Sequence, residues 1–260
     1  MEIIITEDKK AASCLAAKIV SKQIEKKPDS VLGLATGSTQ LPLYKELIKL
    51  HKEGMVDFRK ITTFNLDEYV GLSSEHPSSY HSYMWKNFFS FINIKKHKIH
   101  IPNGLAPDIS DHCKQYEGNI RASGGIDLQI LGLGSDGHIG FNEPSSSLSS
   151  RTRIKTLTEK TIKDNAPLFK NKNEIPRHVI TMGVGTIMDS KKCLMLVFGE
   201  KKAEAVKQMI EGPISSSIPA SILQMHNNTI VIIDKDASSL LGRRDYYKWV
   251  YRNKPDWQKI

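Results

Sequence analysis

Short apolar runs alternate with longer amphipathic stretches along almost the whole chain. The segment Val-Leu-Gly-Leu-Ala at 31 to 35 and the segment from Cys193 to Phe198 have the length and composition of buried strands. Stretches of helical composition lie between such runs. This alternation predicts an α/β fold, in which an open, mostly parallel sheet carries helices on both faces.

The same pattern gives approximate bounds for the elements. We predict strands at 3 to 6, 31 to 35, 61 to 66, 126 to 133, 177 to 182, 193 to 198 and 229 to 233. We predict helices at 8 to 26, 41 to 52, 78 to 91 and 109 to 122, and a further helix that follows residues 199 to 202 and ends at about 211.

The segment from Ser145 to about Asn173 is polar and has no strong period, which predicts a flap or an excursion from the main sheet. We find no linker and no repeat, so residues 1 to 260 are expected to form a single domain with a flap at about 145 to 175.

Composition narrows the function classes. The 37 Lys and Arg residues outnumber the 28 Asp and Glu residues, and the net charge is +9. The lysines are scattered among acids, without a basic tail or arginine-rich block, which argues against nucleic acid and membrane surfaces as partners. Cys14, Cys113 and Cys193 are widely spaced, and no signal peptide or membrane-length apolar run is found. We therefore expect a cytoplasmic protein.

Three titratable side chains follow the strand predicted at 126 to 133. They are Asp136, His138 and Glu143, within a glycine-rich loop. A nearby carboxylate can hold a histidine in one tautomer and stabilise its charged form, so this loop is a candidate proton-transfer centre. The alternative is a polar loop with an incidental histidine.

A candidate anion site follows the strand at 31 to 35. Thr36, Gly37, Ser38 and Thr39 stand between that strand and a predicted helix, where backbone N–H groups, hydroxyls and the helix N-terminus can hold a phosphate. The lysine of a nucleotide P-loop and the repeated glycines of a dinucleotide site are missing. As an isolated motif, this turn could also be purely structural.

Two further candidates follow other strands. Asp67, with Glu68, could accept a carbon-bound proton, or it could be a helix N-cap. Lys202, with Lys201, could bind an anion, or it could be an ordinary surface lysine. The loops at 36 to 39, 67 to 69, 136 to 143 and 199 to 202 each follow a predicted strand, and the carboxyl ends of parallel strands share one edge. The candidates are therefore expected to converge on one crevice.

These residues belong to longer motifs with a known order. The motifs are Leu-Ala-Thr-Gly-Ser-Thr at 34 to 39, Thr-Phe-Asn-Leu-Asp-Glu-Tyr-Val-Gly-Leu at 63 to 72, Gly-Ser-Asp-Gly-His-Ile-Gly-Phe-Asn-Glu-Pro at 134 to 144, Ser-Arg-Thr-Arg-Ile-Lys-Thr-Leu-Thr at 150 to 158 and Thr-Met-Gly-Val-Gly-Thr-Ile-Met-Asp at 181 to 189. In these motifs the chain resembles the glucosamine-6-phosphate deaminase family over nearly its full length.

The resemblance implies a Rossmann-like sheet and a cofactor-free, metal-free enzyme of amino-sugar catabolism. Its reaction would convert glucosamine 6-phosphate and water to fructose 6-phosphate and ammonia, by an aldose-ketose isomerisation coupled to deamination. By position, His138 would open the sugar ring, and Asp136 and Glu143 would orient and polarise His138. Asp67 would take the C2 proton. The loop from Thr36 to Thr39, together with Lys202, would hold the phosphate.

The chain departs from this family in two places. The family's loop commonly reads glycine-glycine-threonine-proline, whereas this chain has Gly37-Ser38-Thr39-Gln40. In the flap, Pro167 stands where the family usually has a phosphate-binding arginine. Lys163, Lys170 or Lys172 could replace that arginine only as point charges. We predict weaker phosphate affinity or a different closed flap, with the same reaction.

Some family members are activated by N-acetylglucosamine 6-phosphate at a subunit interface. The matching positions are Ser146, Arg153, Lys155 and Thr156, a basic and hydroxyl-rich set. The set could equally be part of the framework of the flap. The C-terminal region differs from that of the allosteric hexamers, so homo-oligomerisation and allostery stay open at this point.

Two rival functions remain. A 6-phosphogluconolactonase has a similar fold and glycine-histidine loop, but usually carries Asp-Glu-Arg where this chain has Asp67-Glu68-Tyr69. A non-catalytic sugar-phosphate sensor would have little use for Asp67, His138 and Glu143 together. Both comparisons favour the deaminase.

Overall fold

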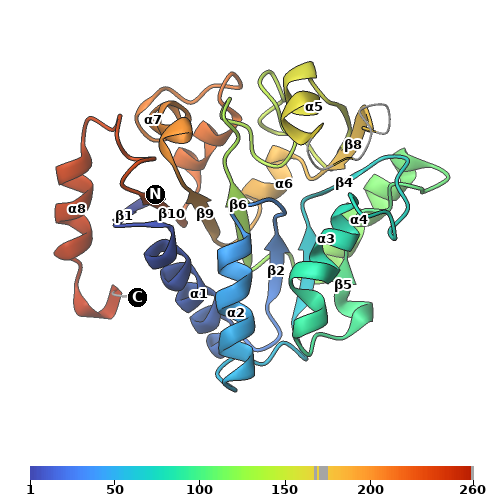
Figure 1. Ribbon diagram of the computed structural model, residues 1–260, viewed down its shortest axis with the longest axis horizontal. Helices are drawn as coiled ribbons and strands as arrows, with labels where there is room; N and C mark the ends of the chain where they lie inside the picture. Colours follow the sequence, from blue (N-terminus) through green and yellow to red (C-terminus); the bar gives the residue numbers. More distant parts are fainter. Residues whose placement is uncertain (167–168, 170–174, 259–260) are drawn as a thin grey trace.

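A seven-stranded sheet forms the centre of the computed structural model, which describes residues 1 to 166, 169 and 175 to 258 (Figure 1). All neighbouring strands in it run parallel, in the order β1-β10-β9-β6-β2-β3-β5. The bounds are β1 (Glu2–Thr6), β2 (Val31–Leu34), β3 (Thr62–Asn65), β5 (Ile99–His100), β6 (Leu128–Gly132), β9 (Cys193–Val197) and β10 (Thr229–Asp234). The predicted parallel sheet is confirmed.

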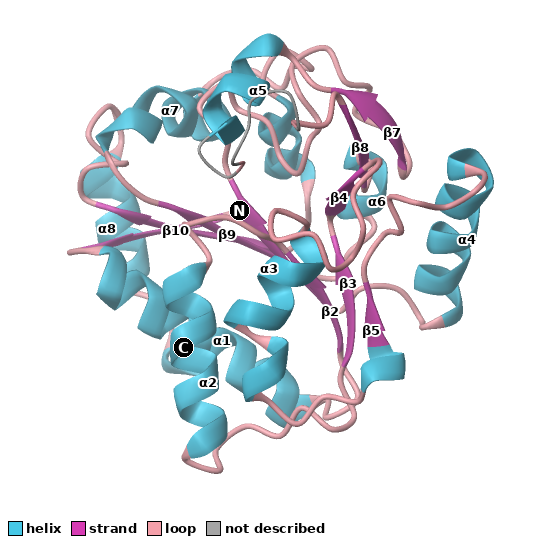
Figure 2. Ribbon diagram, turned by 45° about the vertical axis from the view of Figure 1, so that its right-hand side comes forward, coloured by secondary structure: helices cyan, strands magenta, loops and turns pink. Residues whose placement is uncertain are grey.

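Helices cover both faces of this sheet (Figure 2). One face packs against α1 (Lys9–Lys26), α2 (Leu41–Lys52) and α3 (Tyr80–Asn87), and the other against α4 (Ile109–Ala122), α6 (Val184–Met188) and α7 (Ala203–Glu211). Strand β9 shows why its apolar run has no polar alternation. Leu194 and Leu196 join the core under α1 and α2, while Met195 and Val197 join the core under α7.

A second, three-stranded antiparallel sheet lies beside the carboxyl ends of the main sheet. Its order is β4 (Asp67–Tyr69), β8 (His178–Thr181), β7 (Arg153–Thr156), and α5 (Glu159–Asn165) follows β7 (Figure 1). Residues 67 to 69 are therefore a strand, not the loop that we predicted, and the strand near 177 to 182 belongs to this small sheet. A three-residue strand is too short to show a period, and in β7 the apolar Ile154 is exposed while the charged Arg153 and Lys155 are half-buried, which is the reverse of the usual alternation.

One predicted helix is shorter than expected. The helix predicted at 78 to 91 ends at Asn87, because Phe88 leaves the helical conformation before the short 3-10 turn η1 (Phe89–Phe91). Near the end of the chain, α8 (Arg244–Arg252) packs beside β1. The other 3-10 segments are η2 (Lys96–Lys98), η5 (Glu200–Lys202), η6 (Pro219–Met225) and η7 (Asp256–Gln258).

The strand order also fixes where a ligand can bind. From β2 the chain proceeds outward through β3 to β5, then returns to the other side of β2 as β6 and continues outward through β9 and β10. The connections that leave β2 and β6 therefore diverge, and such a switch point opens a crevice at the carboxyl ends of the two strands. Among the residues that the structure describes, no helix has the length and apolar character needed to span a bilayer.

Candidate active site

A cavity of about 480 Å³ lies at this switch point. The structure brings seven of the predicted site residues into its lining: Thr36, Gly37, Ser38, Thr39, Asp67, His138 and Lys202. Asp136 lies directly behind His138, whereas Glu143 and the set Ser146, Arg153, Lys155 and Thr156 are outside the lining. The loops that carry these seven lining residues therefore meet at one crevice, as expected.

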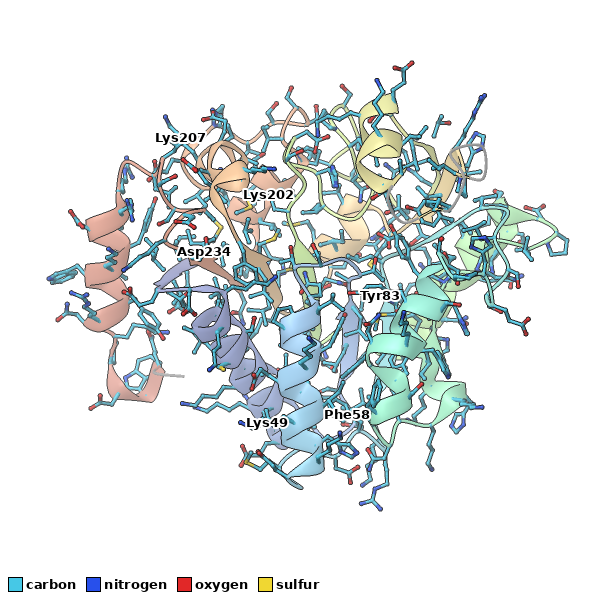
Figure 3. The ribbon with its side chains drawn as sticks, in the orientation of Figure 1. Lys49, Phe58, Tyr83, Lys202, Lys207 and Asp234 are labelled. Atoms are coloured by element: carbon cyan, nitrogen blue, oxygen red, sulfur yellow. The ribbon has the colours of Figure 1, made fainter. Side chains whose placement is uncertain are left out.

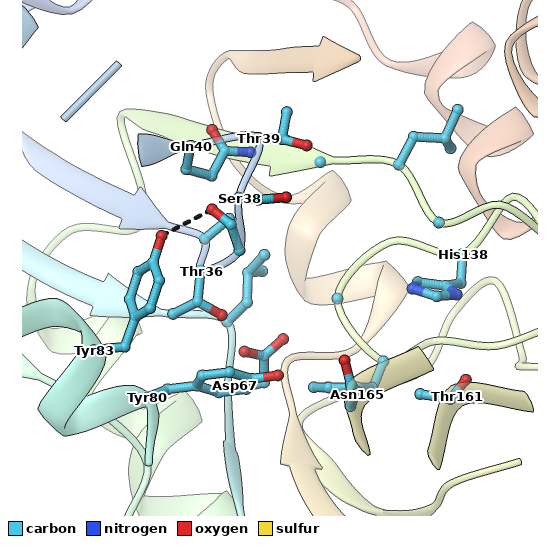
Figure 4. A pocket seen from close by; sticks show the side chains of 18 of the residues that line it. Thr36, Ser38, Thr39, Gln40, Asp67, Tyr80, Tyr83, His138, Thr161 and Asn165 are labelled. Carbon is cyan, nitrogen blue, oxygen red and sulfur yellow. Dashed lines mark hydrogen bonds between the residues drawn. The ribbon is translucent and has the colours of Figure 1, made fainter. Parts of the chain in front are cut away.

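The Thr36–Thr39 turn is held open toward the cavity by contacts from two helices. Gly37 has a φ of 109°, a conformation that favours glycine. Its carbonyl oxygen accepts a hydrogen bond of 2.8 Å from the Tyr83 hydroxyl of α3, while Lys9 Nζ of α1 lies 3.5 Å from the Ser38 carbonyl oxygen (Figure 4). With these carbonyl oxygens engaged by side chains, the turn can present N–H groups and hydroxyls to an anion.

Asp67 stands at the junction of the two sheets. Its backbone begins β4, opposite Thr181 of β8, and its side chain is only 6% exposed. The loop after β6 approaches it closely, since a Cβ built on Gly140 would lie 3.7 Å from Asp67 Oδ2. Burial, together with the charge of Glu68, raises the pKa of Asp67 to about 8. A proton acceptor with a pKa near neutrality is well matched to general base catalysis.

The helix-capping role that we considered for Asp67 belongs to Glu68. The Glu68 carboxylate accepts hydrogen bonds from the backbone N–H groups of Tyr69, Tyr80 and His81, at 2.8 to 2.9 Å. Burial raises the pKa of Glu68, and these three donors act in the opposite direction. Glu68 thus ties β4 to the first turn of α3, which leaves the Asp67 side chain on the cavity side.

His138 and Asp136 form a pair at the opposite wall. His138 Nδ1 lies 2.6 Å from Asp136 Oδ1, and both side chains are about one quarter exposed. Burial alone would raise the pKa of Asp136, but the hydrogen bond and charge of His138 outweigh it and lower that pKa to about 2. A carboxylate this close to Nδ1 favours the tautomer with its proton on Nδ1, which would leave Nε2 free to exchange a proton with a ligand.

The backbone around this pair leaves little room. A Cβ built on Gly134 would lie 2.3 Å from His138 Nδ1, so the imidazole packs directly on the glycine backbone. The ring also lies over Phe141, with centroids 6.5 Å apart and planes inclined by 18°. Figure 4 shows His138 and Asp67 on different walls of the same cavity. His138 and Asp136 therefore lie together as predicted, and backbone packing sets the orientation of the imidazole.

Glu143 is placed differently from the expectation. Its buried carboxylate accepts hydrogen bonds from the Thr158 backbone N–H and hydroxyl, the latter at 2.7 Å, and a shorter one from the Thr161 hydroxyl. Both threonines belong to the start of α5. Glu143 thus anchors the helix that carries Thr161 and Asn165 into the cavity lining.

Lys202 reaches the cavity from the turn after β9. Gly199, with a φ of 85°, begins this turn, and its backbone N–H donates to both carboxylate oxygens of Asp234, at 3.1 and 3.0 Å. Figure 3 shows Lys202 above the carboxyl-terminal edge of the sheet, with Tyr83 on the far side toward α3. Lys202 lies in η5, immediately before α7. Lys202 therefore lines the cavity from the end of a 3-10 turn, and it precedes the first turn of α7.

The four residues considered as an effector site do not share one surface. Along β7 the side chains alternate, so Arg153 and Lys155 lie on the half-buried face while Thr156 lies on the exposed face. Arg153 donates to the Asn142 side-chain oxygen at 2.9 Å. Ser146 is buried. This arrangement fits the alternative that the set is partly a structural framework.

Sequence reasoning missed several side chains of the lining, among them Gln40, Tyr80, Tyr83, Thr161 and Asn165. Tyr80 and Tyr83 are three residues apart, so the sequence could have placed them on one face of a helix. The sequence could not show that this helix, α3, lies beside the cavity. Pro167, Lys170 and Lys172 lie outside the described residues. Lys163 is exposed and lies 3.9 Å from Glu159 on α5. In the described part of the chain, no group of three or more His, Cys, Asp or Glu side chains could hold a metal ion.

The fold and the cavity define an α/β protein that can hold a small anion next to acid–base groups. The chain belongs to the family of glucosamine-6-phosphate isomerases and 6-phosphogluconolactonases, whose model matches residues 7–232. The resemblance inferred from the motifs is therefore confirmed.

Individual relatives refine this assignment. The chain is 53% identical over 245 residues to a glucosamine-6-phosphate deaminase of Thermoanaerobacter sp. (strain X514), covering 94% of this chain and 97% of that protein. It is 48% identical over 260 residues to a glucosamine-6-phosphate deaminase of Arthrobacter sp. (strain FB24), covering both chains completely. A solved monomeric glucosamine-6-phosphate deaminase has a TM-score of 0.90 and 46% identity, covering 92% of this chain and 100% of that one. The 6-phosphogluconolactonase of Trypanosoma brucei, with a TM-score of 0.74 over 93% and 98% of the two chains but only 18% identity, shares the fold.

Proposed function

We propose that this protein is a glucosamine-6-phosphate deaminase, which converts glucosamine 6-phosphate and water to fructose 6-phosphate and ammonia. One observation carries the proposal: a buried carboxyl with a pKa near 8 and a histidine–carboxylate pair face the same cavity as an anion-binding turn. Relatives of about 50% identity over nearly the whole chain bear the same name.

Ring opening is the first step, and it falls to His138. The imidazole takes the proton of the C1 hydroxyl at Nε2 and returns a proton to the ring oxygen, while the C1–O5 bond breaks. Asp136 holds Nδ1 and stabilises the imidazolium that forms in between. Glu143 supports this step from a distance, because it holds α5 against the cavity.

Isomerisation is the second step, and it falls to Asp67. Its carboxylate removes the C2 proton of the open-chain sugar, and that electron pair forms the C1–C2 double bond of an enolamine while the C1 carbonyl π pair moves to O1, which takes up a proton. The proton returns at C1, which leaves an imine at C2. Addition of water and loss of ammonia then give the ketose. The carbon chain supplies all the electrons, so we propose that no metal or organic cofactor takes part.

The phosphate end of the substrate is assigned to the turn from Thr36 to Thr39 and to Lys202, which line the same cavity. Because a flap arginine is replaced by Pro167, we predict weaker phosphate affinity than a bidentate donor would provide. A substrate-saturation curve with ordinary affinity would remove that prediction.

Ammonia release from glucosamine 6-phosphate by the purified protein tests the proposal, with 6-phosphogluconolactone as a parallel substrate. Turnover of the amino sugar with no lactone hydrolysis is expected. Lactone hydrolysis alone would assign the other activity of the family, and binding without turnover would indicate a sensor.

The finer predictions rest on the same assay. The whole chain is proposed to act as one domain, with the segment at about 145 to 175 as a lid, and as a cytoplasmic enzyme. Activation by N-acetylglucosamine 6-phosphate through Ser146, Arg153, Lys155 and Thr156 would give a sigmoidal saturation curve that the effector makes hyperbolic. A hyperbolic curve without the effector would leave these residues their structural role, and sedimentation of the protein would give its oligomeric state.

A further inference from the structure

Gln40 combines complete burial with an unusual lack of partners. Its side chain is 0% exposed, and neither Oε1 nor Nε2 has a hydrogen-bond partner among the described residues. Leaving both ends of an amide unsatisfied in a protein interior is costly, and such groups in native proteins generally meet a water or a ligand. Gln40 is nevertheless part of the lining of the cavity.

The position of Gln40 indicates which part of a ligand it would meet. It directly follows Thr39, and its backbone N–H donates to the Gly37 carbonyl oxygen at 3.1 Å, so the residue closes the anion-binding turn. Its amide lies against the end of β6, since a Cβ built on Gly132 would lie 3.2 Å from Nε2. Figure 4 shows the side chain beside Thr39, on the opposite side of the cavity from Asp67 and Tyr80.

The side chain does not serve the helix that it precedes. Gln40 is the N-cap residue of α2, but its side chain makes no capping hydrogen bond, and Pro42 in the first turn reduces the number of N–H groups that need one. A helix cap therefore does not explain why a buried position carries an amide.

We propose that the Gln40 amide is a phosphate-recognition group: Nε2 donates a hydrogen bond to a phosphoryl oxygen of the substrate from beneath the Thr36–Thr39 turn. This inference rests on the proposed function for the identity of the sugar, but only on the cavity for the anion. A neutral donor at the base of the turn complements the charge of Lys202. It also gives the site a group whose hydrogen bond is made only when a phosphate is present.

The substitution Gln40→Leu tests the role, because it keeps the volume and removes both polar atoms. The Michaelis constant for glucosamine 6-phosphate and the inhibition constant of inorganic phosphate should rise about ten- to a hundredfold, with kcat changed less than about threefold. The melting temperature of the unliganded protein should stay the same or rise, since an unsatisfied amide is removed, while the stabilisation by inorganic phosphate should shrink.

Gln129 offers a matched control. It is also a buried glutamine with an unpartnered Oε1 among the described residues, but its Nε2 donates to the Ile130 carbonyl oxygen and it lies outside the cavity lining. Gln129→Leu should lower the melting temperature and leave the response to phosphate unchanged. Gln40→Glu, which places a negative charge at the same point, should weaken phosphate binding more than Gln40→Leu.

Equal phosphate response in Gln40→Leu and the unchanged protein would overturn the inference, and so would a loss of phosphate response in Gln129→Leu as large as that in Gln40→Leu. The thermal measurement needs no turnover. If the unchanged protein binds phosphate through Gln40 but releases no ammonia, the proposed function fails and this inference stands.

Discussion

Two aspartates of the candidate site, one in the cavity lining and one behind His138, differ in pKa by several units. Asp67 is enclosed at the junction of the two sheets beside Glu68, and its pKa is raised to about 8. Asp136 is about one quarter exposed and paired with His138, and its pKa is lowered to about 2. Residue type is identical, so burial, hydrogen bonds and charged neighbours together produce the difference. Groups whose pKa values are driven apart in this way can be given separate acid–base roles.

The difference in pKa supports different proposed roles for Asp67 and Asp136. A carboxyl that exchanges its proton near neutral pH can shuttle the proton between two carbons, whereas one that stays ionised can only orient and stabilise a partner. The central prediction is that changes at these two aspartates affect different steps.

Asp67→Asn should have the largest effect, because it removes the proposed base while keeping the shape of the side chain. We expect kcat to fall by about 10² to 10⁴-fold. Exchange of the C2 proton with deuterated solvent, followed by NMR, should stop. Retained C2 exchange in a variant with a normal circular dichroism spectrum would contradict the assignment of Asp67.

Asp136→Asn should have the next largest effect, since the amide cannot stabilise the imidazolium and does not dictate the His138 tautomer. A loss of roughly ten- to a hundredfold in kcat is expected with the ring-closed sugar. The discriminating measurement is solvent exchange of a C1 proton of fructose 6-phosphate in the presence of ammonia, because the C2 imine formed there is deprotonated at C1 without passing through the glucosamine ring. This exchange should be much less affected than in Asp67→Asn, and equal losses in both variants would break the division of roles.

The pH dependence gives a third test of the comparison. Because the base must be ionised, kcat/KM should rise with pH until about pH 8, where Asp67 titrates. For stability, the sign follows from the raised pKa. The contribution of protonated Asp67 is complete below the ordinary aspartate pKa of about 3.9 and is lost as the pH rises through about 8.

The control for this pH test is again Asp67→Asn. Urea unfolding should show that the unchanged protein loses stability relative to the variant as the pH rises from about 4 to about 8. A constant difference in unfolding free energy over that interval would show that the Asp67 pKa is not raised.

Tyr83→Phe should have the smallest effect and should touch neither aspartate. It removes the 2.8 Å hydrogen bond to the Gly37 carbonyl oxygen and so loosens the turn from Thr36 to Thr39, the proposed phosphate site. We expect the Michaelis constant to rise about three- to tenfold, with little change in kcat or in the pH profile. A shifted pH profile would mean that the turn and the two carboxyls are coupled.

Much of this arrangement could be predicted from the sequence, and particular elements show what could not. Buried strands such as β9 and β10 can be recognised as apolar runs. The turn at Thr36–Thr39 can be recognised from the small residues that follow such a run. Strand β4 has three residues and β7 is half exposed, so neither carries a recognisable period. The small sheet was therefore missed.

The electrostatics of the site depend on that missed sheet. The pKa of Asp67 is raised because β4 pairs with β8 and the loop at Gly140 closes over the carboxyl, contacts between segments more than 70 residues apart. No local pattern encodes such a contact. For the same reason Glu143 could be recognised as a site residue, but its contact with α5 could not be foreseen.

The burial of Asp67 has a consequence for inhibitor design. With a pKa of about 8, this carboxyl is mostly a neutral acid at physiological pH, so it can donate a hydrogen bond as well as accept one. A tight-binding compound should then present an uncharged acceptor to Asp67 and reserve its cationic group for the Asp136 side of the cavity. Compounds with an ammonium aimed at Asp67 would first have to drive off its proton, and their potency should improve as the medium becomes more alkaline.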